Sequence, residues 1–215
     1  MYTPAHFAES RLPVLHELMQ QYPLAAIVAS SKSGLEANHV PLVLETARGQ
    51  FGTLCGHIAR SNSMWQDVPA GAEVLVVFQG ANHYVSPNWY PSKQDHGKVV
   101  PTWNYSVVHA RGRIEWFQDP VWLRALLEKL TDHHEAAFGA PWHVGDAPAD
   151  YVQRMLGAIV GFEIPIHDLQ GKLKLSQNQK SQDRAGVIAG LERRGGEAAR
   201  VVAAAVEQPG GKTGG

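Results

Sequence analysis

Four residues with polar-tipped side chains, Thr102 to Tyr105, stand at the head of a segment that then alternates like a β-strand. Trp and Tyr are costly to bury unless their polar tips find partners, but their flat faces suit a planar ring that is rimmed with hydrogen-bonding atoms. A flavin or a nucleobase is such a ring. The residues leave two interpretations open: a ring-binding wall, or a barrel rim where Trp103 and Tyr105 fill a corner of the core.

A second group of candidate residues is Arg60, Ser61 and Asn62, which follow a strand-like segment and precede a predicted helix. Ser61 or Asn62 could cap that helix. The free N–H groups of its first turn, together with the Arg60 guanidinium, would suit a phosphate. The alternative is a plain helix cap beside an exposed arginine.

The third candidate segment runs from Gly171 to Arg184 and carries Lys172 and Lys174 on one face of an extended stretch. Ser176, Gln177 and Asn178 follow directly. Such a segment could bind a phosphate or the polar edge of a ring. A charged, amide-rich run is also typical of a solvated loop, and this interpretation stays open.

The aromatic loop at residues 82–93, with two prolines, is interpreted as a lid or an interface element, or else as an ordered surface loop.

Several kinds of catalytic and metal site have no support in the sequence. The eleven histidines include His133, His134 and His143, but their spacing does not match HExxH. No G-x-S-x-G elbow, G-x-G-x-x-G or P-loop is present. The single cysteine, Cys55, excludes an intrachain disulfide and a cysteine-based zinc site within one chain. We expect no metal and assign no catalytic residue.

Composition and charge limit the partners. The chain has 215 residues, 44% hydrophobic and 18% charged, which predicts one large domain or one domain with a small appendage. A formal charge of -1 gives no global basic field that would draw the protein to nucleic acid or anionic lipid. The N-terminus has acidic residues and a proline where a secretory signal needs a basic start and an apolar run, and no span approaches membrane length. We expect a cytoplasmic protein without a membrane partner.

Hydrophobic periodicity predicts the elements that must position these residues. Helices are expected at residues 12–21, 120–138 (with Asp119 as N-cap), 148–159, 183–194 and 197–207. Strands are expected at residues 24–30, 38–45, 50–59, 73–80 and 105–116, then at 160–169 with an interruption at Pro165, and at 171–176. Strand and helix do not alternate regularly, which favours an antiparallel α+β barrel or sandwich. The terminal residues 209–215 are expected to be flexible.

A set of motifs in consistent order resembles the PaiB family of FMN-binding negative transcriptional regulators. The motifs are "MYTPAHF", "GHIARSN", "VVFQGANHYVSPNWYPSK", "KVVPTWNYSVVHARG", "DAPADYVQRML", "AIVGFEI" and "KLKLSQNQ" followed by "DRAGVIAGL", covering the chain from Met1 to about Leu191. The resemblance implies an antiparallel split β-barrel that binds FMN, related in fold to pyridoxamine phosphate oxidases and flavin reductases, with peripheral helices. It implies a homodimer with flavin sites between subunits, and a division into a split-barrel domain, residues 1–191, and a C-terminal helix with a Gly-rich tail, residues 192–215.

The resemblance also implies roles for particular residues. Cofactor binding is expected of three sets: the phosphate residues His57, Arg60, Ser61 and Asn62; the ring residues Thr102, Trp103 and Asn104; and the C-terminal residues Lys174, Ser176 and Gln177, which reach the same site or the partner's. Gln179 stands where the family motif often has arginine.

Three functional hypotheses remain: a transcriptional repressor, an FMN-dependent oxidoreductase or flavin reductase, and a regulator that senses its flavin. DNA is a partner by family inference alone. The last predicted helix, "EAARVVAAAVEQ", carries one arginine and would read bases poorly, so we predict that it packs against the rest of the chain.

Overall fold

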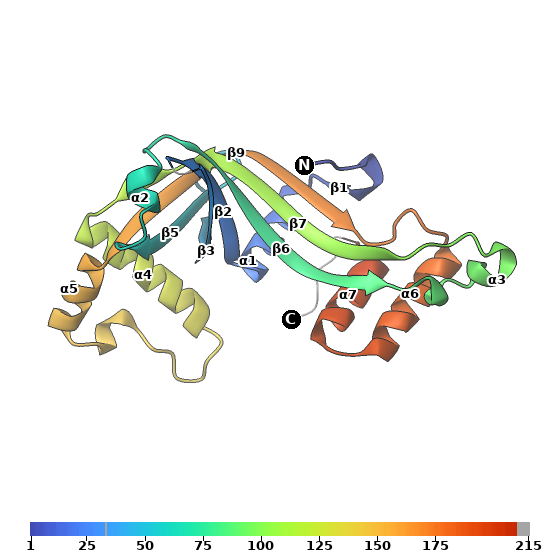
Figure 1. The fold of residues 1–215 in the computed structure, drawn as a ribbon. Helices are drawn as coiled ribbons and strands as arrows, with labels where there is room; N and C mark the ends of the chain where they lie inside the picture. The colour runs from blue at the N-terminus through green and yellow to red at the C-terminus, as the bar shows by residue number, and fades with distance from the viewer. Residues whose placement is uncertain (33, 210–215) are drawn as a thin grey trace. The chain divides into compact units, whose positions relative to one another are not determined.

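The structure is a computed structural model that describes residues 1–32 and 34–209. Its elements, with 3₁₀ helices written η, are η1 Ala5–Phe7, β1 Ala8–Glu9, α1 Leu12–Gln21, β2 Leu24–Ser31, β3 Gly34–Pro41, β4 Val43–Glu45, β5 Thr53–Ala59, α2 Met64–Asp67, β6 Glu73–Val85, η2 Pro87–Trp89, α3 Ser92–His96, β7 Thr102–Arg113, β8 Glu115–Phe117, α4 Pro120–Glu135, η3 Val144–Asp146, α5 Ala149–Gly157, β9 Ile159–Lys174, α6 Ser181–Arg194 and α7 Glu197–Glu207 (Figure 1).

The strands form an antiparallel arrangement in the order β3-β2-β6-β7-β9-β5-β4, with β1 and β8 also pairing with β9. The central place predicted for the strand that begins at Glu73 is confirmed, since β6 lies between β2 and β7. Its Val, Leu and Phe side chains suit a strand with neighbours on both sides.

The chain divides into two compact units. Unit 1 comprises Met1–Gln21, Gln79–His109 and Gln170–Gly215, and unit 2 comprises Tyr22–Phe78 and Ala110–Leu169. Strands β6, β7 and β9 each have residues in both units. The predicted domain boundary at residue 191 falls within α6 and stays a prediction, while the predicted flexible tail lies, apart from Pro209, outside the described residues.

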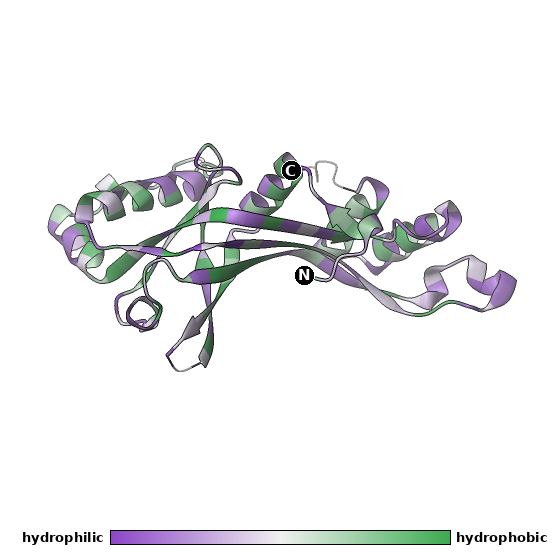
Figure 2. Cartoon of the chain, turned by 90° about the horizontal axis from the view of Figure 1, so that it is seen from above, coloured by the Kyte–Doolittle hydropathy of each residue, from purple (hydrophilic) through white to green (hydrophobic). Residues whose placement is uncertain are grey.

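In unit 2, α4 and α5 begin and pack as their sequences predict. Asp119 caps α4 by accepting hydrogen bonds from the backbone N–H groups of Val121 and Trp122. Leu123 of α4 and Leu156 of α5 belong to one buried cluster. Figure 2 shows polar and apolar residues side by side along these helices, as expected of helices with one buried face.

In unit 1, α6 holds the segment that contains η2 and α3. The indole of Trp89 lies against Gly190, where a Cβ would come within 2.3 Å of the ring. The buried carboxylate of Asp183 accepts two hydrogen bonds from Ser92, one from its backbone N–H at 3.1 Å and one from its hydroxyl at 2.9 Å. The aromatic segment is therefore fixed to a helix by packing and by a buried polar contact.

Three expectations about strands were wrong. The single strand expected at residues 105–116 is instead β7 and β8, which are separated by Ile114. The segment expected to break at Pro165 is one continuous strand, β9, in which Pro165 lies opposite Thr53. A proline can remain in a strand where no ladder bond needs its missing N–H, so the residue type alone did not end the strand. The single strand expected at 38–45 is instead β3 and β4, which pair with β2 and β5 respectively and are separated by Leu42.

Candidate functional site

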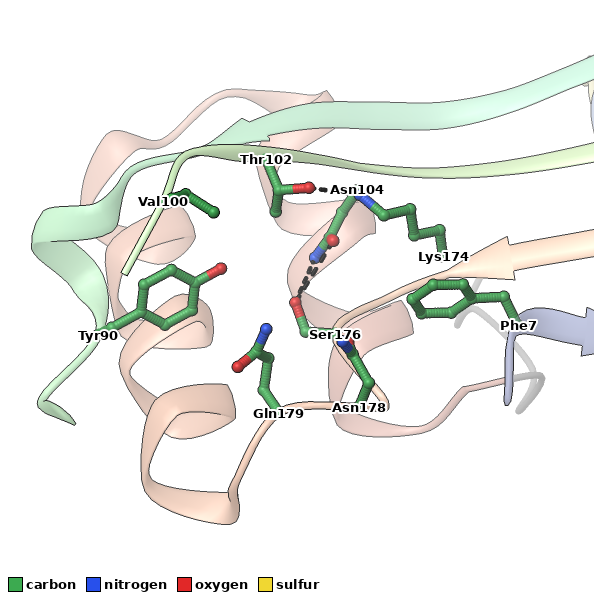
Figure 3. Close-up of a pocket in the computed structure, with 9 residues that line it drawn as sticks. All are labelled: Phe7, Tyr90, Val100, Thr102, Asn104, Lys174, Ser176, Asn178 and Gln179. Atoms are coloured by element: carbon green, nitrogen blue, oxygen red, sulfur yellow. Dashed lines mark hydrogen bonds between the residues drawn. The ribbon is translucent and has the colours of Figure 1, made fainter. Parts of the chain in front are cut away.

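A pocket of about 200 Å³ lies in unit 1, where β7 begins and β9 ends. Nine residues line it: Phe7, Tyr90, Val100, Thr102, Asn104, Lys174, Ser176, Asn178 and Gln179 (Figure 3). Four of them, Thr102, Asn104, Lys174 and Ser176, are residues for which the resemblance implies cofactor binding. The antiparallel pairing of β7 with β9 brings together two segments that are about 70 positions apart in the chain.

Strand alternation decides which residues of the polar head of β7 reach this pocket. Thr102 and Asn104 are two residues apart and lie on the same face of the strand, whereas Trp103 points to the other face. The Trp103 side chain is 49% exposed, and its Nε1 donates a hydrogen bond to Asn82 Oδ1 at 3.3 Å. Its ring lies edge-on to that of Tyr84, with 6.0 Å between the centroids. The structure therefore brings two of the three predicted ring residues into the pocket and leaves the third outside.

The back of the pocket is a buried pair, Asn104 and Ser176. Asn104 Nδ2 donates to Ser176 Oγ at 3.0 Å, and the hydroxyl lies 3.3 Å from Asn104 Oδ1. Ser176 has φ +63°, a left-handed conformation that is uncommon for a residue other than glycine and that survives only where the surroundings hold it. The Asn104 contact is one of the interactions that hold it.

Gln177 shapes the turn instead of facing the pocket. Its Oε1 accepts a hydrogen bond from Leu175 N at 2.7 Å, and its Nε2 donates to Leu173 O at 2.5 Å. Both ends of the amide are thus bound to backbone. The predicted role of Gln177 in direct cofactor binding has no geometric support, although the side chain fixes the turn that carries Ser176.

Lys174 supplies the one cationic side chain among the nine lining residues. Its Nζ donates hydrogen bonds to Thr102 Oγ1 and, at 2.9 Å, to the Trp103 carbonyl oxygen. Burial, and to a smaller degree the nearby charge of Lys172, lowers the pKa of Lys174 below its usual value. Lys172 itself is turned elsewhere, donating to Tyr2 O at 3.1 Å.

Two polar residues of the pocket, Tyr90 and Gln179, were assigned no cofactor contact by the sequence analysis, and Asn178 was named only as part of the polar segment after Lys174. Tyr90 is 5% exposed and stands two residues before Ser92, the residue that Asp183 holds. Burial, and secondarily the charge of Asp183, raises the pKa of the Tyr90 phenol. The nearness of Asn178 and Gln179 to Ser176 in the chain was a usable signal, but nothing in the sequence placed Tyr90 beside them.

The predicted phosphate residues lie in unit 2. Arg60 donates three hydrogen bonds, from Nε to Gly157 O at 2.7 Å, from Nη1 to Gln118 Oε1 at 2.7 Å and from Nη2 to Ile159 O at 3.0 Å. A guanidinium has five N–H donors, so two remain for another partner. Ser61 is exposed, and its hydroxyl has no hydrogen-bond partner in the described part of the chain.

The helix after these residues begins later than expected. Helix α2 starts at Met64 and has four residues. Its first N–H donates to Asn62 Oδ1 at 2.9 Å, while Asn62 Nδ2 donates to Asn38 Oδ1 at 2.7 Å. The N-cap position is occupied by Ser63 and not by Ser61 or Asn62 as predicted, although the Asn62 side chain still satisfies an N–H of the first turn. A helix this short offers few free N–H groups for an anion.

His57 lies on β5, opposite Gly161 of β9. Its Nδ1 is buried and has no hydrogen-bond partner within the described residues. Burial lowers the pKa of His57, because desolvation disfavours the charged imidazolium. The ring is thus held neutral, with one polar atom unpaired.

Cys55 has the properties of a buried structural thiol. It is 4% exposed, and its Sγ lies 3.9 Å from both Arg48 Nη1 and Glu163 Oε1. Burial first, and the Glu163 carboxylate second, raises the pKa of the Cys55 thiol to about 12. Arg48 offsets this only in part, because its guanidinium is paired with Glu163 through two hydrogen bonds of 2.7 Å.

We therefore expect Cys55 to be unreactive toward thiol reagents in the native protein. At pH 8 a thiol with this pKa is ionised about a thousandfold less than an ordinary cysteine, and the thiolate is the reactive form. Labelling by a disulfide reagent should be at least a thousandfold slower in the native state than in denaturant, where the single thiol should react completely. Labelling of the native protein at the rate of a free thiol would contradict this account of Cys55.

Among residues 1–32 and 34–209, no group of three or more His, Cys, Asp or Glu side chains could hold a metal ion. None of the helices in the described chain is both long and apolar enough to cross a bilayer.

Comparisons with known proteins agree with this fold and identify the family. Residues 1–168 match the family described as "Putative FMN-binding domain". An uncharacterized protein of Emericella nidulans is 35% identical, with 98% of each chain covered. The protease synthase and sporulation protein PAI 2 of Bacillus subtilis is 30% identical, with 89% of each chain covered. The solved structure of an FAD and heme binding protein from Mycobacterium smegmatis has a TM-score of 0.58 and 17% identity, covering 82% of this chain and 77% of that chain.

The protein is thus an antiparallel α+β protein of the split-barrel class, and the predicted fold class is confirmed. The chain belongs to the FMN-binding domain family, as the resemblance to PaiB-type proteins predicted. FMN, the expected cofactor, is the ligand by which that family is described. The matched residues end at 168, before Lys174 and the turn that follows it.

Proposed function

We propose that this chain binds FMN and uses the pocket of unit 1 to hold part of the cofactor. The observation that carries the proposal is the convergence of Thr102, Asn104, Lys174 and Ser176 on one pocket from two distant segments. Hydroxyl, amide and ammonium groups beside an apolar wall fit a flat ring that carries carbonyl and N–H groups at its edge. When bound, FMN would supply redox chemistry, and the protein would supply position and polarity.

For unit 2 we propose that Ser61 and the two free N–H groups of Arg60 contact the phosphate, with His57 and Asn62 as neighbouring supports. Arg60 already donates to three protein oxygens, so only its two remaining N–H groups are available for the phosphate. We propose that Trp103 and Gln177 support the site without contacting FMN in this pocket. Trp103 follows Thr102 in β7, and the Gln177 side chain fixes the turn that carries Ser176. The two sets of residues lie in different units and are proposed independently.

The test of this proposal is an FMN titration followed by quenching of flavin fluorescence. Wild-type protein is expected to bind FMN, and Lys174→Met to bind it at least tenfold more weakly. The matched control is Lys180→Met, since Lys180 is exposed and lies outside the pocket lining. If the Lys174 and Lys180 variants bind FMN with equal affinity, the pocket of unit 1 is not part of the FMN site.

For the biological role, we propose a homodimeric, flavin-dependent regulator. The support is the resemblance to PaiB-type repressors, the 30% identity with a protein named for protease synthesis and sporulation, and the exposed aromatic side chains of Tyr84 and Trp103, which suit an interface. DNA binding has less support. Helix α7 buries Ala199, Val202, Ala203 and Val206, so the predicted packing role of this helix is confirmed and Arg200 is its one exposed cation.

An FMN-dependent oxidoreductase is the second candidate function. The observation that favours it is the Tyr90 phenol, a potential proton donor that lines the same pocket as Lys174. Steady oxidation of NAD(P)H with an electron acceptor would favour the enzyme. Salt-dependent retention of one promoter fragment over random DNA would favour the repressor. Size-exclusion chromatography of the FMN-loaded protein tests whether it is a homodimer.

A further inference from the structure

Three polar side chains that line the pocket of unit 1 have no hydrogen-bond partner among the residues that the structure describes. They are the phenol of Tyr90 and the amides of Asn178 and Gln179. Figure 3 shows Tyr90 and Gln179 directed toward the buried pair of Asn104 and Ser176. Most of the Tyr90 side chain is buried, but its hydroxyl is not among the fully buried atoms that lack a partner in the described chain, so it remains accessible from the pocket. The Asn178 amide is exposed and that of Gln179 is half-buried. All three groups are therefore available to pair with a ligand that enters the pocket.

The charge of the pocket limits what that ligand can be. No carboxylate lines the pocket, and its one cation, Lys174, already donates two hydrogen bonds and has a single N–H left. A phosphate dianion is normally held by several cations or by a set of N–H donors. The pocket instead offers neutral groups that both donate and accept, which suits an uncharged or singly charged ligand group.

The volume of the pocket and its apolar lining residues limit the kind of ligand further. A volume of about 200 Å³ is below the roughly 300 Å³ of pockets that enclose a whole small-molecule ligand, so the pocket fits one end of a larger molecule. Phe7 and Val100 supply apolar wall, which suits a flat ring. An amide presents an acceptor and donors side by side, and it therefore pairs with an imide, whose edge alternates carbonyl, N–H and carbonyl.

We propose that this pocket binds the imide edge of the flavin ring, the end that carries N3–H between two carbonyl groups, and that Asn178 and Gln179 recognise it. The proposal rests on the proposed function, that the chain binds FMN, and it deepens that function by assigning a part of the cofactor to this pocket. Lys174 and the Tyr90 hydroxyl donate to the carbonyl oxygens. Of the two amides, Asn178 and Gln179, one accepts from N3–H through its oxygen, and the N–H groups of the pair donate to the adjacent carbonyl oxygens.

The test compares two probes that lack the ribityl phosphate, lumiflavin and N3-methyl-lumiflavin, together with FMN. Dissociation constants come from fluorescence quenching. Wild-type protein is expected to prefer lumiflavin over the N3-methyl compound at least tenfold. Gln179→Met and Asn178→Leu keep side-chain size but remove the amides, and each should cut that preference several-fold. Gln182→Met, at an exposed position outside the pocket lining, is the matched control and should keep it.

The outcomes separate this proposal from the proposed function. If wild-type protein binds FMN but the two variants keep the full preference for lumiflavin, the imide assignment is overturned and FMN binding stands. If the two variants and Lys174→Met weaken FMN but leave lumiflavin affinity unchanged, the pocket holds the phosphate and the assignment is again overturned. If no flavin binds wild-type protein, both proposals fail. The Asn178 and Gln179 amides have no hydrogen-bond partner in the described chain, so both variants are expected to keep the wild-type unfolding midpoint.

Discussion

Replacing Asp183 with alanine is expected to lower the free energy of unfolding by about 3 kcal/mol, because two buried donors lose their acceptor at once. The carboxylate, 4% exposed, accepts from both the backbone N–H and the hydroxyl of Ser92. A buried donor left unpaired costs about 1–3 kcal/mol. Because Ser92 is two residues from Tyr90, the pocket wall should also loosen, and FMN affinity should fall. Urea unfolding and an FMN titration measure the two effects.

Two further variants separate this contact from a general effect of mutating α6. Asp183→Asn keeps one carbonyl acceptor and should lose less stability than Asp183→Ala. Glu192→Ala changes an exposed carboxylate on the same helix and should stay within about 0.5 kcal/mol of wild type. If Asp183→Ala is no less stable than Glu192→Ala, the buried contact with Ser92 does not support the fold as described.

The second large effect is expected at Gly112 of β7. A Cβ at this position would lie 2.4 Å from the Pro165 carbonyl oxygen and 2.5 Å from Ile164 Cγ2. The first of these atoms is backbone and cannot rotate away, so the strands themselves would have to separate. We expect Gly112→Val to lose about 4 kcal/mol or more, in the range that overpacking of a buried site can reach, or to yield no folded protein.

The control for Gly112→Val is Gly157→Ala at the end of α5, where an added Cβ would meet no atom within 4 Å. Alanine there should be neutral or slightly stabilising, since it has the higher helix propensity. Circular dichroism during thermal unfolding compares the two variants. A Gly112→Val protein that unfolds at the wild-type temperature would contradict the close approach of β7 and β9 at this point.

The elements that the sequence predicted best are those whose signals are local. Helix α4 has an N-cap aspartate, a proline in its first turn and a regular apolar stripe, and all three act within a few residues. Pro165 was misinterpreted because its tolerance depends on which neighbouring strand needs its N–H, and this pairing is set by residues far away in the chain. The break at Leu42 is similar, since β3 and β4 have different partners.

The same difference between local signals and long-range pairing explains which parts of the candidate site the sequence could predict. The sequence marked Asn104 and Ser176 as candidate cofactor-binding residues. Only the pairing of β7 with β9 shows that the two side chains form a hydrogen bond with each other. Trp103 could have been set apart from Thr102 and Asn104 by strand alternation alone, because its neighbours share the opposite face. Tyr90 reaches the pocket through the attachment of its segment to α6, which no local pattern indicates.

Equilibrium dialysis of the protein against FMN tests the central claim, cofactor binding, most directly. The retained ligand would be quantified by its flavin absorbance and identified by mass after the protein is denatured. The account predicts about one retained FMN per chain, and clear loss of retention in Lys174→Met. A protein that stays colourless, with no FMN retained above the level of the surrounding buffer, would contradict it.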